Sequence, residues 1–326
     1  MVTKDTGAAT RGAAGTIETN AGPDAALPSV VGKLCQTNNR MVQKLCGGRE
    51  ERALPSRAMT IEIVEELRSV LFPGYFGVSE LDLCSIGFHV GSTLDRVMRL
   101  LREQILRGLC FVCPGGDKAL CEACRDKSVA ITHMFISRLP EVQRLLSSDV
   151  SATHAGDPAA TSTDETIFCY PGILALTNFR VAHELHALGV PLIPRMITEH
   201  AHSITGIDIH PGARLGESLF IDHGTGVVVG ETTIIGDRVK IYQGVTLGAI
   251  AFPADESGIA IKGRPRHPVV EDDVIIYSGA TLLGRITIGR GSVIGGNVWL
   301  TESVPPRSRV LQSGVRAERF LNGEGI

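Results

Sequence analysis

A six-residue repeat in the C-terminal half constrains the fold of this chain more than any other feature. One aliphatic residue recurs every six positions, apart from one two-residue slip and one longer gap. The thirteen positions are Ile209, Leu215, Ile221, Val229, Ile235, Ile241, Leu247, Val270, Ile276, Leu282, Ile288, Ile294 and Leu300. Glycine often follows the aliphatic residue, where a corner needs unusual backbone angles. The repeat predicts a parallel β-helix of three short strands per coil, with the aliphatic residues inside.

The two interruptions of the repeat indicate where loops leave the coils. The slip covers residues 223–226, and the gap covers residues 249–266. A solenoid expels its insertions as loops, often on the functional side. The periodicity alone does not give the hand of the coils, because ordinary parallel crossovers are right-handed.

The residues before the repeat have helical periodicity. Apolar residues recur at helical spacing over 58–109, 129–146 and 172–202, and Pro191 and Pro194 interrupt the last stretch. We expect a polar link over 147–166. The first 30 residues are rich in Ala, Gly, Thr and Pro, which favours disorder. The sequence therefore predicts an α+β chain, with a poorly ordered extension (1–57), an all-helical domain (58–203), a β-helix (204–304) and a tail (305–326).

Charge and hydropathy exclude several classes of partner. The net charge is −3, and no basic stripe or nucleic-acid-reading motif accompanies it, so we expect no nucleic-acid partner. The sequence has no run of 18 apolar residues and no secretory signal. We therefore expect a cytoplasmic protein that does not bind membranes and acts on small molecules.

Two CxxC pairs lie within the helical region, Cys110 with Cys113 and Cys121 with Cys124. Four thiolates at this spacing can surround one tetrahedral ion, and CxxC pairs are typical of structural zinc sites. We expect a zinc site in an insertion over 110–124. An iron–sulfur cluster is the alternative metal centre, and a redox pair or unligated thiols is the third interpretation.

Three segments carry a family resemblance. The run IDIHPGARLGESLFIDHGTGVVVGE, followed by RPRHP, is similar to the serine acetyltransferase family of hexapeptide-repeat acyltransferases. The match covers about residues 157–326. The resemblance implies left-handed coils and transfer of acetyl from acetyl-CoA to the hydroxyl of L-serine, the first step of cysteine biosynthesis. It also implies feedback inhibition by L-cysteine and assembly as homotrimers or dimers of trimers.

His223 is the candidate general base, because imidazole can take a hydroxyl proton near neutral pH. Asp208 lies 15 residues earlier, close to one coil, and so is expected to stack beside His223 and fix its tautomer. The resemblance implies the same Asp–His dyad. The alternative is that His223 only caps a corner. Cys169 is a further candidate nucleophile, but a lone cysteine in an apolar stretch is more often buried in the core.

Four residues are candidates for serine binding. The guanidinium of Arg266 suits a bidentate grip on a carboxylate, and the resemblance assigns both Arg266 and His267 to the substrate. Asp157 and Asp222 are expected to face the substrate ammonium. Each of these two carboxylates is equally typical of a helix cap or a corner.

The CoA contacts are predicted where small side chains admit the pantetheine arm. These residues are Gly248, Ala249, Ser278, Gly279 and Gly296. Here Gly248 precedes Ala249, where the family usually has a second glycine.

The last residues, Gly323 to Ile326, resemble the family's C-terminal tail. That tail inserts into the active site of cysteine synthase (O-acetylserine sulfhydrylase), so Ile326 is a candidate partner-binding residue. A frayed end is the alternative.

Three other functions compete with this interpretation. A β-helix metalloenzyme of the carbonic anhydrase kind needs histidines that converge on zinc, and the spacing of His210, His223 and His267 does not match one. A non-catalytic scaffold for cysteine synthase predicts loss of His223 or Asp208, and both are present. An acyltransferase that acts on homoserine or a sugar is the main alternative.

Overall fold

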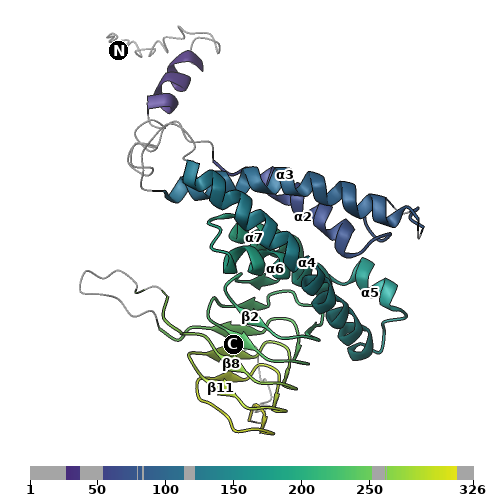
Figure 1. Cartoon of the computed structure of the whole chain (residues 1–326). Helices are drawn as coiled ribbons and strands as arrows, with labels where there is room; N and C mark the ends of the chain where they lie inside the picture. Colours follow the sequence, from purple (N-terminus) through teal and green to yellow (C-terminus); the bar gives the residue numbers. More distant parts are fainter. Residues whose placement is uncertain are drawn as a thin grey trace, which may run out of the picture. The chain divides into compact units, whose positions relative to one another are not determined.

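The chain divides into two units, residues 1–52 and residues 53–326. The computed structural model describes residues 27–36 and 54–313, except 79, 83, 114–121, 252–260 and 262. In the first unit, residues 27–36 form a helix within the segment that was expected to be poorly ordered. The second unit contains the helices α2–α7 and all the strands of the described residues (Figure 1).

In the described part of the second unit, six helices precede the strands. They are α2 (Arg57–Leu71), α3 (Ile86–Val112), α4 (Glu122–Gly156), α5 (Thr163–Cys169), α6 (Pro171–Ala187) and α7 (Ile193–Thr205). The side chain of Ser56 accepts a hydrogen bond from the Met59 N–H and so caps α2. Leu67, Leu101, Phe135 and Leu176 are fully buried among the helices. Among the described helices, none is long and apolar enough to cross a bilayer.

Helix α4 corrects one prediction, because it continues through Gly156 where a polar link was expected. The hydroxyls of Ser147, Ser151 and Thr153 donate hydrogen bonds to carbonyls one turn earlier, at 2.8–2.9 Å. These bonds satisfy the polar side chains within the helix. Polarity alone therefore suggested a loop that the backbone does not form.

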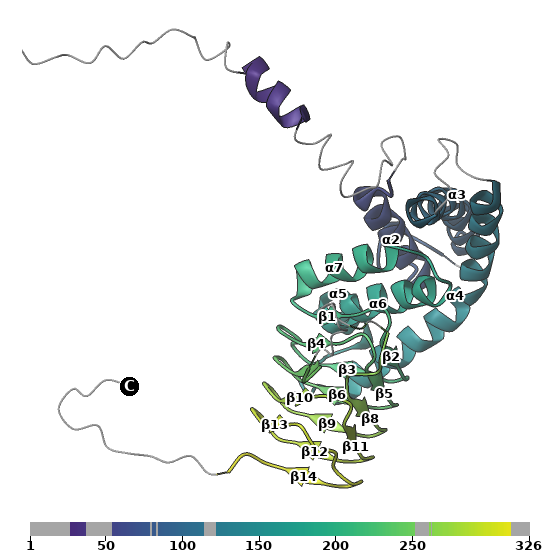
Figure 2. The same cartoon turned by 90° about the vertical axis from the view of Figure 1, so that its left-hand side faces the viewer.

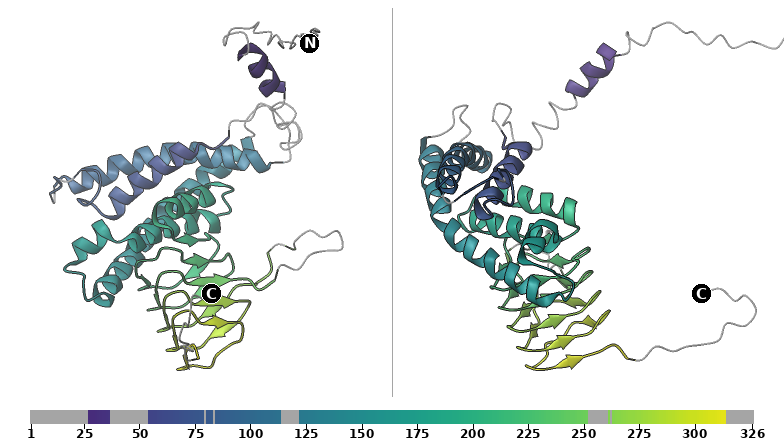
Figure 3. Two further views of the ribbon diagram at one scale, coloured as in Figure 1. Left: turned by 180° about the vertical axis from the view of Figure 1, so that it is seen from behind. Right: turned by 90° about the vertical axis from the view of Figure 1, so that its right-hand side faces the viewer.

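The strands form a parallel β-helix with three sheets (Figure 2). The first sheet has the order β1-β4-β7-β10-β13, the second β11-β8-β5-β2 and the third β14-β12-β9-β6-β3. The strands are β1 (Asp208–Ile209), β2 (Arg214–Leu215), β3 (Phe220–Ile221), β4 (Val228–Val229), β5 (Ile234–Ile235), β6 (Lys240–Ile241), β7 (Thr246–Gly248), β8 (Val269–Val270), β9 (Ile275–Ile276), β10 (Thr281–Leu283), β11 (Thr287–Ile288), β12 (Val293–Ile294), β13 (Trp299–Leu300) and β14 (Arg309–Val310). Figure 3 shows the same stack of strands from two further sides.

All thirteen aliphatic positions of the repeat lie in strands β1–β13, as predicted. Eleven of them are at most 2% exposed and so line the interior of the prism. Strand β14 lies within the segment expected to be the tail. The six-residue count missed this strand because Pro305 and Pro306 interrupt the interval before it.

Two edges of the first sheet carry the candidate site residues. The His223 edge is the set of corners between the third and first sheets, at residues 222–226, 242–244, 277–279 and 295–297. The His267 edge is the set between the first and second sheets, at 210–212, 230–232, 249–251, 263–268 and 284–285. Helices α4, α6 and α7 contact the first coil through β1 and β3.

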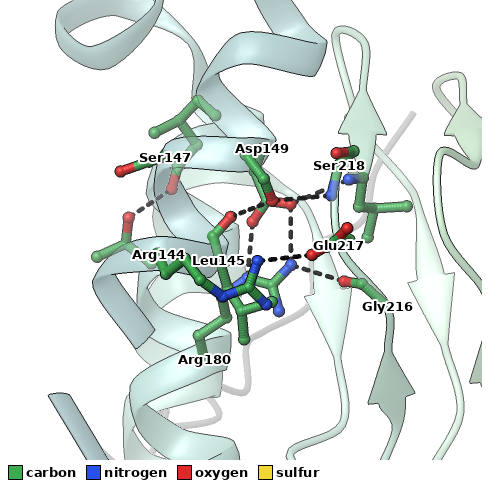
Figure 4. A network of polar contacts seen from close by, with 12 residues as sticks. Arg144, Leu145, Ser147, Asp149, Arg180, Gly216, Glu217 and Ser218 are labelled. Carbon is green, nitrogen blue, oxygen red and sulfur yellow. Dashed lines mark hydrogen bonds and ion pairs between the residues drawn. The ribbon is translucent and has the colours of Figure 1, made fainter. Parts of the chain in front are cut away.

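A buried ion pair joins two helices to the first coil (Figure 4). The Arg180 guanidinium on α6 donates to both carboxylate oxygens of Asp149 on α4, at 2.7 and 2.8 Å, and to the Gly216 carbonyl at 2.9 Å. The Leu219 N–H donates to Asp149 Oδ1 at 3.0 Å. The two side chains are 3% and 0% exposed. The pair therefore links α4, α6 and the corner before β3.

We predict that Asp149→Asn lowers the free energy of unfolding by about 3–5 kcal/mol, because it leaves the buried Arg180 charge without a counter-ion. The control is Arg144→Gln, which removes the exposed pair with Glu217 and should cost about 0–1 kcal/mol. Urea unfolding followed by circular dichroism measures both. Equal losses in the two variants would contradict the prediction.

Candidate functional site

His223 projects from a corner that is two residues longer than the others on its edge. Asp222, Tyr242 and Tyr277 occupy equivalent positions, because their N–H groups donate to Ile241, Ile276 and Ile294 on the next coil. His223 and Gly224 are the extra residues. The His223 side chain is 72% exposed, and its Nε2 lies 3.9 Å from Asp222 Oδ1. The predicted slip is therefore a short protrusion that presents an imidazole to solvent.

The backbone of this protrusion is left-handed, with φ of 54° at His223 and 78° at Gly224. A Cβ at Gly224 would lie 2.4 Å from Ile207 Cδ1, so only glycine fits there. The Gly226 N–H donates to the Gly206 carbonyl at 2.8 Å. These contacts hold the protrusion against the start of the first coil.

Asp208 begins β1 on that first coil, and its N–H donates to the Val227 carbonyl at 2.9 Å. Asp208 therefore pairs with the strand that follows the His223 protrusion. Among the hydrogen bonds of the described residues, none joins the side chains of Asp208 and His223. The Asp–His dyad stays a prediction.

Helices α4 and α5 bring Asp157 to the same edge. The Tyr170 hydroxyl donates to Asp157 Oδ2 at 2.6 Å, and the Ala159 N–H donates to Oδ1 at 2.8 Å. These bonds lower the pKa of Asp157, and His223 lowers it further by its charge. The same hydrogen bond raises the pKa of Tyr170 to about 12, with a further contribution from Asp222. Asp157 is therefore an anion in the same electrostatic environment as His223 and Asp222.

Two glycines allow the helices to approach β3 closely. A Cβ at Gly156, the last residue of α4, would lie 2.6 Å from the Phe220 ring. A Cβ at Gly172 in α6 would lie 2.4 Å from the Ile221 carbonyl oxygen. The sequence analysis missed both glycines and Tyr170, because their roles depend on contacts between distant segments.

The predicted carboxylate-binding residues lie on the His267 edge. The Arg266 guanidinium donates to Glu231 Oε2 at 2.6 Å. His267 is 6% exposed, and its Nδ1 accepts the Thr232 N–H at 3.0 Å. Burial, and then the charge of Arg266, lowers the pKa of His267 to about 4. Burial also lowers the pKa of His210 to about 4, so both imidazoles are neutral.

A pocket of about 330 Å³ adjoins this cluster. His186, Arg214, Glu231, Thr232 and Arg285 are among the residues that line it. The sequence analysis missed Glu231 and Thr232, although both follow the Gly230 corner. Their partners, Arg266 and His267, are separated from them by the long loop.

The predicted CoA residues divide between the two edges. Gly248 in β7 pairs with Leu283, and Ala249 follows it on the His267 edge. Ser278, Gly279 and Gly296 lie on the His223 edge, where Gly279 has a φ of 71°. Within one chain, the candidate base and the candidate carboxylate-binding residues are therefore separated by the width of the first sheet.

The cysteine cluster is only partly described. Cys110 is buried, and Cys113 and Cys124 are half-buried, whereas Cys121 lies outside the described residues. In the part of the chain that the structure covers, no three His, Cys, Asp or Glu side chains form a metal-binding group. The zinc site stays a prediction. Cys169 is exposed rather than buried in the core, and Ile326 lies outside the described residues.

We predict that stability falls as the pH decreases from 6.5 toward 4. The pKa values of folded His267 and His210 are about 4, against an ordinary 6.5. The unfolded chain therefore binds more protons in this range, and the stabilisation present above pH 6.5 is lost below it. His267→Gln, which keeps an acceptor for Thr232, should flatten this dependence, whereas the exposed His133→Gln should not. Thermal melts across the range measure the effect, and an unchanged slope in His267→Gln would contradict it.

Comparisons with known proteins identify relatives of this chain. The profile of the bacterial transferase hexapeptide family (six repeats) matches residues 267–302. The plasmid serine acetyltransferase of Synechococcus elongatus is 53% identical over 302 residues, which cover 92% of this chain and 95% of the relative.

Two solved structures are also similar. Serine acetyltransferase 1 of Entamoeba histolytica, in complex with L-cysteine, has a TM-score of 0.67 and 34% identity, over 80% of this chain and 90% of that one. Serine acetyltransferase of Brucella abortus, in complex with coenzyme A, has a TM-score of 0.51 and 28% identity, over 78% of this chain and 94% of that one. The fold is the left-handed parallel β-helix preceded by helices. With its hexapeptide coils and a relative that matches nearly its whole length, this chain belongs to the serine acetyltransferase family.

Proposed function

We propose that this chain transfers the acetyl group of acetyl-CoA to the hydroxyl of L-serine, giving O-acetyl-L-serine and CoA. The main observation in support of this reaction is that the exposed imidazole of His223 lies beside two carboxylates, those of Asp157 and Asp222. An amino-acid acceptor supplies both a hydroxyl for the base and an ammonium for the carboxylates. The family of the chain and the names of its relatives support the same reaction.

His223 acts as general base in this proposal. Its imidazole takes the serine hydroxyl proton while the oxygen attacks the thioester carbonyl. The tetrahedral intermediate then expels CoA thiolate, and the imidazolium returns the proton to the sulfur. Asp208, on the coil before the protrusion, fixes the tautomer of His223. No covalent acyl-enzyme forms, so no cysteine takes part.

Asp157 and Asp222 bind the substrate ammonium. The Tyr170 hydrogen bond holds Asp157 in its charged form. Arg266 and His267 bind the substrate carboxylate, and Glu231 orients the Arg266 guanidinium. Because these residues lie on the other edge of the first sheet, they come from a second copy of the chain. A trimer that packs a His223 edge against a neighbouring His267 edge brings both sets together.

Acetyl-CoA lies along the His223 edge, over the small residues Ser278, Gly279 and Gly296. Gly248 and Ala249 of the neighbouring copy face it from the other side. The Brucella abortus relative, solved in complex with coenzyme A, supports this co-substrate. The Entamoeba histolytica relative, in complex with L-cysteine, supports inhibition by L-cysteine at the serine site. We further propose that the tail with Ile326 binds cysteine synthase.

We predict that the purified chain releases thiol from acetyl-CoA with L-serine, and that His223→Ala lowers the rate by about 10²–10⁴-fold, as expected for the loss of a general base. Asp208→Asn should lower kcat more than it raises KM for serine. The control is His133→Ala, an exposed histidine on α4. Release with L-homoserine but not L-serine would change the acceptor, and no release with either would favour the scaffold function.

Zinc at the four cysteines needs its own measurement. We predict that the purified protein contains bound zinc and that the double variant Cys113→Ser, Cys121→Ser loses it, because each CxxC pair then lacks one thiolate. Elemental analysis by mass spectrometry measures zinc and iron together. Unchanged zinc in the variant would contradict the site, and iron in place of zinc would identify a cluster.

A further inference from the structure

An aromatic ladder runs from Phe220 in β3 to Tyr242 and Tyr277 on the His223 edge. The rings of Phe220 and Tyr242 lie edge to face, with centroids 6.4 Å apart and an interplanar angle of 70°. The rings of Tyr242 and Tyr277 are stacked, with centroids 5.1 Å apart and an angle of 9°. Such pairs stabilise each other beyond the area they bury. The ladder is therefore a connected element, not three separate side chains.

The regular coil spacing places these tyrosines in the column above Asp222, the residue that precedes the candidate base. Four residues hold the same position on successive coils: Asp222, Tyr242, Tyr277 and Gly295. The backbone N–H of each of the first three donates to the carbonyl of the residue that precedes the next member of the series. His223 directly follows Asp222 in the sequence. Two stacked phenols therefore occupy the column that begins at Asp222, and Gly295 ends the column without a side chain.

The lower end of the ladder is buried, and exposure increases toward its upper end. Phe220 is 1% exposed and lies against Gly156 of α4. Tyr242 is half-buried against Phe220, and burial, followed by the charge of Asp222, raises its pKa. Tyr277 is 42% exposed, so one face of its ring covers Tyr242 and the rest remains open to solvent.

We propose that the Tyr242–Tyr277 stack is the wall that restricts the acyl donor to short acyl groups such as acetyl. This inference rests on the proposed function, in which the pantetheine arm lies over Ser278 and Gly279, next to Tyr277. A thioester that reaches His223 along this edge carries its acyl group past the tyrosine faces. Acetyl fits beside the stack, whereas each further methylene meets a ring that Phe220 and α4 hold in place. The ring faces, not the hydroxyls, set the limit.

The test compares kcat/KM for acetyl-CoA, propionyl-CoA and butyryl-CoA with L-serine as the acceptor. Tyr277→Ala should raise the butyryl-to-acetyl ratio about tenfold or more, since one methylene in a shaped pocket is worth about 10–200-fold. Tyr277→Phe keeps the ring and should leave the ratio unchanged. Phe88→Ala, an exposed aromatic on α3, is the matched control for loss of a ring elsewhere.

A second variant keeps the test valid if Tyr277→Ala does not fold. Tyr277→Leu retains apolar cover over Tyr242 but lacks the flat ring, and should also raise the ratio. Thermal melts establish that each variant is folded. The proposal would be wrong if kcat/KM changed equally for all three donors. It would also be wrong if the butyryl-to-acetyl ratio stayed unchanged in a folded Tyr277→Ala or Tyr277→Leu variant. If the unmodified protein does not transfer acetyl to L-serine, the proposed function is wrong. This result differs from a failure of the tyrosine stack to restrict the donor, which is measured in a protein that does transfer acetyl.

Discussion

The buried pair of Asp149 and Arg180 is the interaction on which the rest of the structure depends. It satisfies two charges that would be costly to bury alone, and each also binds backbone of the first coil. Because Asp149 lies near the end of α4 and Asp157 directly follows that helix, this pair also fixes where the chain emerges from α4. The position of Asp157 beside the β-helix therefore depends on an ion pair that takes no part in the chemistry.

The repeat made the β-helix predictable, because one aliphatic residue per strand is enough to determine which side chain points inward. Ile209 through Leu300 illustrate this, since each strand of two or three residues contains one such position. The helical part was less regular in sequence. Ser147 and Ser151 made the end of α4 look like a loop, since the sequence does not show that their hydroxyls bond to their own helix.

Only part of the candidate site was predictable, because some of its residues are marked by the repeat and others meet only in the folded chain. His223 was identifiable because it lies in a slip of the repeat, and Asp222 directly precedes it. The side chains that bind Asp157 and Arg266 were not identifiable, because Tyr170 reaches Asp157 and Glu231 reaches Arg266 only in the folded chain. Sequence spacing also could not show that the candidate residues occupy two edges of one sheet.

The longer coil at His223 separates strand pairing from the placement of a catalytic side chain, two requirements that proteins usually satisfy with the same residues. Val228 follows its partner Asp208 by 20 positions, whereas Thr246 follows its partner Val228 by 18 positions. The hydrogen-bonded pairing of the strands is nevertheless continuous on both sides of the protrusion. The extra residues thus carry no strand pairing, and the coils above and below need not change when the protrusion does. A solenoid built in this way can acquire a new catalytic group at a corner without redesigning its core.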